Sequence, residues 1–217
     1  MYVPPHFRND DLGSIRAFLG AARLATLFSC GSGGPRASHV PMTFDREPEP
    51  YGTLHCHLAR ANEQWRDLAE GAPVLVVFMG PDAYVSPALY ETKRETGKVV
   101  PTWNYVAVHA HGVAKVFEDR SALHESVSRL TDGREARREE PWHVDDAPAQ
   151  FVDDQLRGIV GVTLEVTRLE AKWKMSQNRS DADVRGVIAG LAQSPLPTER
   201  ETAAVMEDLL ARRKPRA

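Results

Sequence analysis

The segment from Trp103 to Phe117 alternates apolar and polar side chains along its length, which is the pattern of a long β-strand. One face would carry the smaller apolar residues Val106, Val108, Ala110, Ala114 and Val116. The other would carry Trp103, Tyr105, His109, His111 and Lys115. We expect this segment to be the longest strand of the protein.

Further strands are expected on both sides of this segment. Residues 24–30 and 36–44 flank Gly31-Ser32-Gly33-Gly34 and predict a β-hairpin, because glycine supplies the positive φ angles of a tight reversal. Other strands are expected at 51–58, at 73–79, at 83–86 after a turn at Gly80-Pro81-Asp82, and at 159–169. Six or seven strands with few long helices between them favour an antiparallel barrel over a parallel α/β sheet.

Helices are expected at the edges of this β-rich chain. Apolar residues recur at helical spacing after Asn9 or Asp10, either of which can cap the first helix. Shorter helices are expected near 62–70, 123–130 and 149–156, with a long loop at 87–101 and an exposed connection at 132–146. Two helices close the chain, the second with a capping box from Thr198 and Glu201.

Composition narrows the class of protein. The 217 residues are 42% hydrophobic and 26% charged, and no apolar run is long enough to span a membrane. A net charge of −3 provides no general attraction to nucleic acid phosphates. Met1 to Asp11 lacks the pattern of a signal peptide, so we expect a soluble cytoplasmic protein. The motifs of serine hydrolases, P-loops and dinucleotide-binding folds are missing.

The corner from His57 to Trp65 can hold a phosphate. It places His57, Arg60 and Asn62 where a strand leads into a helix, and backbone N–H groups at a helix start attract anions. The guanidinium of Arg60 is a planar set of donors that suits phosphate oxygens. The same residues also suit an exposed helix cap with Trp65 in the core.

Two other segments combine aromatic and polar side chains. Residues 172–179 follow the last expected strand and contain two lysines, an arginine and two amides beside Trp173, which suits a planar charged ligand or a basic surface loop. Residues 101–105 offer an apolar wall with a few polar groups, as a flavin pocket requires, although such aromatics also serve in cores and interfaces. The pairs His55 with His57 and His109 with His111 could bind a metal, but supporting carboxylates or thiols are lacking at a suitable spacing, so we expect no metal site.

Four motifs taken in order resemble the PaiB family, whose members are usually labelled FMN-binding negative transcriptional regulators. The motifs are Met1-Tyr2-Val3-Pro4, His57-Leu58-Ala59-Arg60-Ala61-Asn62, Val100-Pro101-Thr102-Trp103-Asn104-Tyr105 and Lys174-Met175-Ser176-Gln177-Asn178-Arg179. Each motif is weak alone, whereas four in matching order and spacing form a specific signal that covers nearly the whole chain.

The resemblance implies an α+β fold that is mainly β with peripheral helices, an antiparallel split β-barrel related to pyridoxamine phosphate oxidases and flavin reductases. It implies a homodimer with FMN in clefts between subunits. We expect residues 1–175 to form the FMN-binding domain and residues 176–217 a helical pair packed on it. Residues expected to contact FMN are Ser38, His39, His57, Arg60, Asn62, Thr102, Trp103, Asn104, Lys174, Gln177, Asn178 and Arg179.

Three functions fit these patterns. The first is a flavoprotein that performs or senses redox chemistry, an FMN-dependent oxidoreductase among the options, in which the protein orients the cofactor. The second is a DNA-binding repressor, which the rigid connection Gln193-Ser194-Pro195-Leu196-Pro197 and the acidic start of the last helix disfavour. The third is a haem-handling protein with a histidine as axial ligand.

Overall fold

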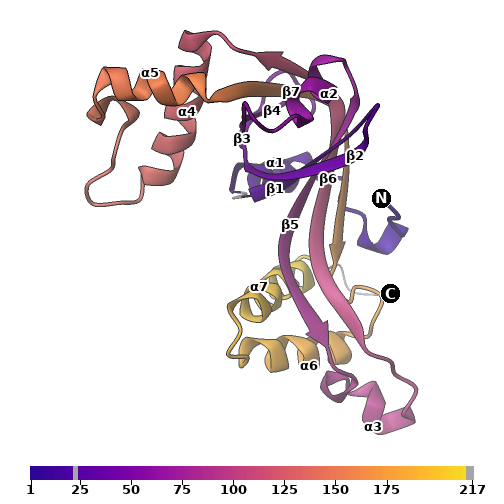
Figure 1. Ribbon diagram of the computed structural model, residues 1–217. Helices are drawn as coiled ribbons and strands as arrows, with labels where there is room; N and C mark the ends of the chain where they lie inside the picture. Colours follow the sequence, from indigo (N-terminus) through magenta and orange to yellow (C-terminus); the bar gives the residue numbers. More distant parts are fainter. Residues whose placement is uncertain (22–23, 214–217) are drawn as a thin grey trace. The chain divides into compact units, whose positions relative to one another are not determined.

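The protein is described by a computed structural model of residues 1–21 and 24–213, shown in Figure 1. The helices are α1 (Leu12–Ala21), α2 (Gln64–Ala69), α3 (Thr92–Thr96), α4 (Arg120–Glu135), α5 (Ala149–Arg157), α6 (Asp181–Ala192) and α7 (Pro197–Ala211). The strands are β1 (Leu24–Gly31), β2 (Gly34–Pro41), β3 (Thr43–Asp45), β4 (Thr53–Ala59), β5 (Pro73–Val85), β6 (Thr102–Phe117) and β7 (Ile159–Lys174). No helix among the described residues has the length and apolar character needed to cross a bilayer.

The strands form a single sheet in the order β2-β1-β5-β6-β7-β4-β3. Hairpin β1–β2 pairs Leu24 with Pro41 through Gly31 with Gly34, and β4 pairs along β7 from Thr53 with Glu165 to Ala59 with Ile159. Each of these pairings is antiparallel. The predicted fold class, mainly antiparallel β with peripheral helices, is confirmed.

The chain divides into two compact units, and strands β5, β6 and β7 contribute to both. The first unit contains residues 1–10, 79–108 and 170–217, and the second contains residues 11–78 and 109–169. The domain boundary at residue 175 stays a prediction.

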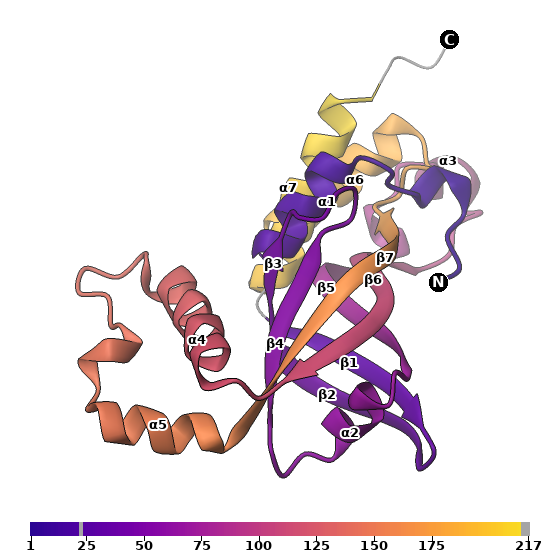
Figure 2. The same cartoon turned by 90° about the horizontal axis from the view of Figure 1, so that it is seen from above.

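The second unit buries alternate residues of its strands. Leu54, Cys56 and Leu58 on β4 lie inside, as do Val160, Val162 and Leu164 on β7, because side chains two apart share one face of a strand. Helices α4 and α5, both visible in Figure 2, pack around a hydrophobic cluster of their own. Its buried members are Leu123, Val144, Val152 and Leu156.

The first unit contains the helical pair. Val184, Val187 and Leu191 on α6 and Ala203 and Met206 on α7 are buried, at the spacing of a helix face. Its share of β5 and β6 supplies further buried residues, among them Ala83, Val85, Val106 and Val108. Ile188, on the same apolar side of α6, is half-buried.

Three predictions about strands and loops were wrong. The turn predicted at Gly80-Pro81-Asp82 is part of β5, in which burial changes from even-numbered residues up to Phe78 to odd-numbered residues from Ala83. Strand β7 continues to Lys174, beyond the predicted end at Leu169, and the expected loop at 87–101 contains α3.

The caps of two helices also differ from the prediction. Asp11, rather than Asn9 or Asp10, accepts hydrogen bonds from the backbone N–H groups of Gly13 and Ser14 at the start of α1. Helix α7 begins with Pro197 after Leu196 and has no side-chain cap, so Thr198 lies inside the helix.

Gly112 on β6 permits a close approach to β7, and this yields a stability prediction. A Cβ atom at Gly112 would lie 2.3 Å from the backbone oxygen of Glu165, whereas a Cβ atom at Gly133 in α4 would meet nothing within 4 Å. We expect Gly112→Ala to lower the free energy of unfolding by about 1–3 kcal/mol through overpacking. Gly133→Ala, the matched control, should raise it by up to about 1 kcal/mol through helix propensity. Equal unfolding curves for both variants in denaturant would contradict this account of Gly112.

Candidate functional site

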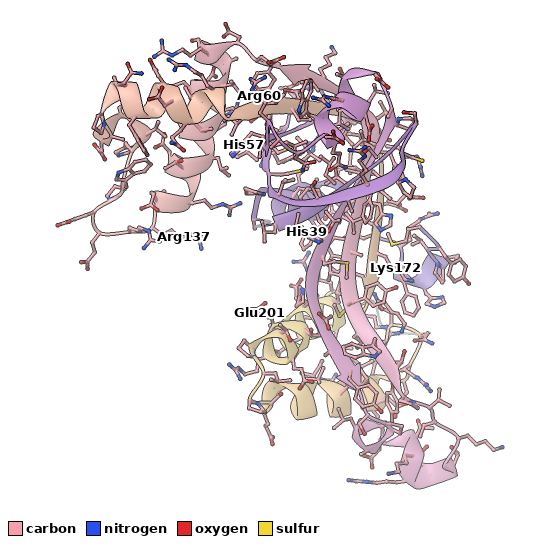
Figure 3. The ribbon with its side chains drawn as sticks, in the orientation of Figure 1. His39, His57, Arg60, Arg137, Lys172 and Glu201 are labelled. Atoms are coloured by element: carbon pink, nitrogen blue, oxygen red, sulfur yellow. The ribbon has the colours of Figure 1, made fainter. Side chains whose placement is uncertain are left out.

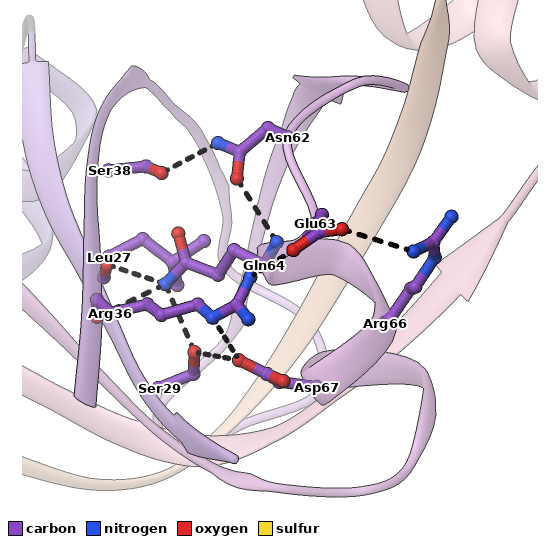
Figure 4. Close-up of polar contacts among 9 residues, drawn as sticks. All are labelled: Leu27, Ser29, Arg36, Ser38, Asn62, Glu63, Gln64, Arg66 and Asp67. Atoms are coloured by element: carbon purple, nitrogen blue, oxygen red, sulfur yellow. Dashed lines mark hydrogen bonds and ion pairs between the residues drawn. The ribbon is translucent and has the colours of Figure 1, made fainter. Parts of the chain in front are cut away.

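Two predicted residues, Ser38 and Asn62, meet in the second unit (Figure 4). The side-chain amide of Asn62 donates to the hydroxyl of Ser38 over 2.8 Å, and its oxygen accepts from the backbone N–H of Gln64 over 3.1 Å. Asn62 therefore joins β2 to the start of α2, and both polar side chains remain partly exposed. The resemblance implies that both residues contact FMN, and the structure brings their side chains together.

A buried polar network lies next to this pair, and sequence analysis missed it. The amide nitrogen of Gln64 donates to the backbone oxygen of Leu27 over 3.0 Å and to the hydroxyl of Ser29 over 3.2 Å. Its amide oxygen is buried and has no hydrogen-bond partner among the described residues. A buried acceptor without a partner is uncommon in a folded protein and marks a place where a ligand donor can be accommodated.

Arg36 and Asp67 complete the network (Figure 4). Arg36 lies 3.4 Å from a carboxylate oxygen of Asp67 and 3.4 Å from one of Glu63. Asp67 is buried, and an added Cβ atom at Gly31 would overlap it at 2.2 Å from a carboxylate oxygen. The sequence offered only the opposite charges of Arg36, on the hairpin, and Asp67, on the short helix, as a hint of this pair.

His39 and His57 lie on strands β2 and β4 of the second unit and are labelled in Figure 3. The imidazole of His39 is exposed and lies 3.1 Å from the hydroxyl of Thr26. The imidazole of His57 forms no hydrogen bond with the residues that the structure describes, and burial lowers its pKa below the usual 6.5. A neutral imidazole at this position can donate or accept a hydrogen bond.

Arg60 is bound mainly by the protein itself. Its Nε donates to the backbone oxygen of Arg157 over 2.8 Å, one terminal nitrogen donates to that of Ile159 over 3.1 Å, and the other pairs with Glu118. These contacts leave part of the guanidinium facing a cavity of about 290 Å³. The cavity is lined by Arg60, Glu118, Arg120, Leu123, Asp153, Leu156 and Arg157.

In the first unit, Asn104 has a structural role. It is fully buried, and its amide donates to the hydroxyl of Ser176 over 3.0 Å, so that β6 is tied to the segment after β7. Ser176 has a φ of 61°, a left-handed conformation that this hydrogen bond helps to hold. Asn104 thus shapes the segment from Met175 to Arg179, and its direct contact with FMN stays a prediction.

Thr102, Trp103 and Lys174 come together in the same unit. The ammonium of Lys174 donates to the hydroxyl of Thr102 over 2.5 Å and to the backbone oxygen of Trp103 over 2.6 Å. Burial, and then the neighbouring charge of Lys172, lower the pKa of Lys174. The indole of Trp103 is 54% exposed and is available to a ligand.

The remaining predicted residues follow β7. The oxygen of the Gln177 side chain accepts from the backbone N–H of Met175 over 2.7 Å, which stabilises the turn. The guanidinium of Arg179 lies 4.7 Å from the centre of the buried Tyr90 ring, while Asn178 is exposed. Of the predicted residues, the structure therefore joins Ser38 with Asn62 in the second unit, and Lys174 with Thr102 and Trp103 in the first.

Comparisons with known proteins identify the family of this chain. Residues 1–168 match the model of a family described as "Putative FMN-binding domain". The chain belongs to this family. It is also 33% identical to Protease synthase and sporulation protein PAI 2 of Bacillus subtilis over 210 residues, which are 97% of this chain and 98% of that protein. The resemblance to PaiB proteins is thereby confirmed.

Two solved structures show the same fold at low sequence identity. The flavocytochrome Anf3 from Azotobacter vinelandii matches with a TM-score of 0.59 and 15% identity, covering 85% of this chain and 78% of that one. An FAD and heme binding protein from Mycobacterium smegmatis also matches with a TM-score of 0.59, at 19% identity, covering 90% and 96%. These matches place the chain among proteins with a flavin-binding split-barrel fold.

The residues present fit the FMN that the family binds. In the second unit, the hydroxyl of Ser38, the amide of Asn62, the imidazole of His57 and the guanidiniums of Arg36 and Arg60 are donors suited to phosphate oxygens. The unpartnered oxygen of Gln64 adds one acceptor, which a donor on the cofactor can satisfy. FMN is thus the cofactor of this family member, with a donor set that matches its chemistry.

The lowered pKa of His57 gives a prediction for stability against pH. Because the folded-state pKa lies below the unfolded value near 6.5, the unfolded chain binds more protons in that window. Stability should therefore be full above pH 6.5 and fall as the pH decreases below it. His57→Gln should make the free energy of unfolding less dependent on pH between about 7 and 5.5, whereas exposed His6→Gln should leave the slope unchanged. Identical slopes in wild type and His57→Gln would contradict the burial of a neutral imidazole.

Proposed function

We propose that this protein is an FMN-dependent redox or flavin-sensing protein of the PaiB type that works in the cytoplasm as a homodimer. The observation that carries the proposal is the corner where Ser38 and Asn62 meet beside the buried Gln64 network, within the residues that match the FMN-binding family. The flavin supplies hydride or electron transfer when bound. The protein supplies donors, orientation and protection from water.

Phosphate binding is assigned to the second unit. Ser38 and Asn62 supply neutral donors at the surface, and Arg36 supplies a charge that Asp67 holds in place. Arg60 has five N–H donors, of which the protein uses part, so the rest can reach an anion. His39 and His57 add imidazole donors from two strands. His57 does so without losing a bond to the protein.

An effect on transcription would be indirect. Exposed Glu201, Glu207 and Asp208 give α7 an acidic surface that would repel DNA phosphates. The arginines near its end are paired, Arg212 with Asp208 and Arg213 with Asp181. We therefore propose that any negative regulation acts through flavin chemistry or through another protein.

Haem binding is a second candidate function. It is favoured by the two solved structures whose titles name a flavocytochrome and a heme binding protein, and by the partner-free imidazole of His57. Neutral imidazole is a common axial ligand of haem iron. The absorption spectrum of the purified protein distinguishes flavin bands from a Soret band.

Arg60 provides a test of phosphate recognition. Arg60→Ala should weaken FMN binding by about one to two decades, since a charge-assisted hydrogen bond contributes roughly 1.5–3 kcal/mol, and should affect riboflavin much less. Arg66, which is exposed and pairs with Glu63, offers the control Arg66→Ala. Flavin fluorescence quenching measures both affinities. Equal losses for FMN and riboflavin would show that Arg60 acts through its bonds to Arg157 and Ile159 alone.

The homodimer is tested by mass in solution. Light scattering at micromolar concentration should give about twice the chain mass of 24.1 kDa. FMN should stabilise the dimer if two chains share each cofactor, because a ligand that binds only the assembled state favours it. A monomer that retains FMN at all concentrations would contradict a shared site.

A further inference from the structure

The first unit presents a face of aromatic and cationic side chains whose composition differs from the phosphate corner. Trp103 and Tyr105 alternate on β6, and Lys172 and Lys174 alternate on β7, so each pair points to one side of its strand. Asn104 and Val106 point to the opposite, buried side, where Asn104 contacts Met206 of α7. Figure 3 shows Lys172 on the side of the strands away from α6 and α7. We call these four residues the Lys–aromatic face.

The two ammonium groups of this face both lie close to one ring. The nitrogen of Lys172 lies 5.1 Å from the centre of the Tyr105 ring, and that of Lys174 lies 5.9 Å from the same centre. Lys172 also lies 5.8 Å from the ring of Tyr2 and donates to its backbone oxygen over 3.2 Å. Contacts with aromatic rings partly offset the loss of hydration of a cation.

Neither lysine has a carboxylate partner among the described residues, although Lys172 is only 6% exposed. Charged side chains are rarely buried without an ion pair, because removing them from water is unfavourable. Glu170, two residues before Lys172 on β7, pairs with the amino group of Met1 at 2.7 Å. The face therefore has two positive charges in a partly apolar setting, and an anion would compensate them.

The surroundings favour an anion with a flat apolar body. Trp103 is 54% exposed and Tyr84 is 45% exposed, and their rings form an edge-to-face pair with centres 6.0 Å apart. Exposed rings of this kind present surface for stacking. Lys174 already uses two of its three donors on Thr102 and Trp103, which leaves one for a ligand. That number suits a carboxylate better than the many oxygens of a phosphate.

We propose that the Lys–aromatic face binds a planar aromatic carboxylate, as a ligand separate from FMN. Lys174 donates to the carboxylate, the buried Lys172 adds positive charge behind it, and the rings of Trp103 and Tyr84 cover the aromatic body. Lys172 and Lys174 lie beyond residue 168, where the match to the FMN-binding family model ends, and the proposal gives Trp103 and Lys174 a ligand other than the FMN that the resemblance implies for them. Binding at this face would give the flavoprotein a second, anionic ligand, as a substrate or as an effector.

The test uses benzoate as the probe on the full chain loaded with FMN, with tryptophan fluorescence and calorimetry as readouts. Saturable binding is expected, with a loss of at least about tenfold in Lys174→Met, the size expected for removing a charge-assisted contact. Lys98→Met, which removes an exposed lysine of the same unit, should bind benzoate like wild type. Lys172→Arg keeps the charge and should retain binding, which guards against misfolding of a neutral variant.

Matched probes decide the ligand class. Benzamide, which lacks the charge, and cyclohexanecarboxylate, which lacks the flat ring, should both bind more weakly than benzoate. Equal binding of inorganic phosphate would overturn the carboxylate assignment, and equal binding of cyclohexanecarboxylate would overturn the stacking role of the rings. Displacement of benzoate by added FMN in the flavin-free protein would assign the face to the flavin and overturn the proposal, while leaving FMN binding itself intact. Absence of any benzoate binding would overturn it as well.

Discussion

The buried side chain of Gln64 is the interaction on which the phosphate corner depends. A single amide nitrogen reaches the backbone oxygen of Leu27 and the hydroxyl of Ser29, so that α2 is held against the hairpin strand β1. Asn62 then links the same helix to Ser38 on β2. Hydrogen bonds of this kind stabilise modestly when made and destabilise strongly when one partner is removed, because the other stays buried. The positions of the donors proposed for the phosphate, Arg36 among them, therefore depend on this network.

The sequence predicted the strands well because their signals are local. Alternation along β6 and the glycines between β1 and β2 are read from a few neighbouring residues, and both elements were found. The turn at Gly80-Pro81-Asp82 was wrong for the opposite reason. Gly80, Pro81 and Asp82 lie within β5, at the point where the buried side chains change from even-numbered to odd-numbered residues. Such a change depends on the elements packed against the strand and not on its own residues. The same limit applies to β7, which continues to Lys174 because β6 lies beside it.

The candidate site was predicted in its residues more than in its chemistry. Ser38 and Asn62 were expected near each other and meet, whereas Arg36, Gln64 and Asp67 were missed because their contacts join positions distant in sequence. Arg60 was expected to offer its donors to a phosphate, and in the structure its guanidinium contacts two backbone oxygens and Glu118. The number of donors that a side chain has left for a ligand depends on its contacts in the folded protein. This number cannot be predicted from the residue type alone.

The two units differ in how they would recognise the two anions proposed for them. In the second unit, Arg36 and Arg60 have acidic or backbone partners, so their charge is largely balanced and binding of a phosphate would depend on fixed donor directions. In the first unit the ammonium groups of Lys172 and Lys174 lack acidic partners among the described residues and rest against aromatic rings, so attraction depends on net charge and on a flat surface. Directed donors select a phosphate by geometry, whereas an uncompensated pair of lysines beside exposed rings selects by charge and shape. A flavoprotein needs both kinds of recognition when its cofactor and its second ligand are each anionic.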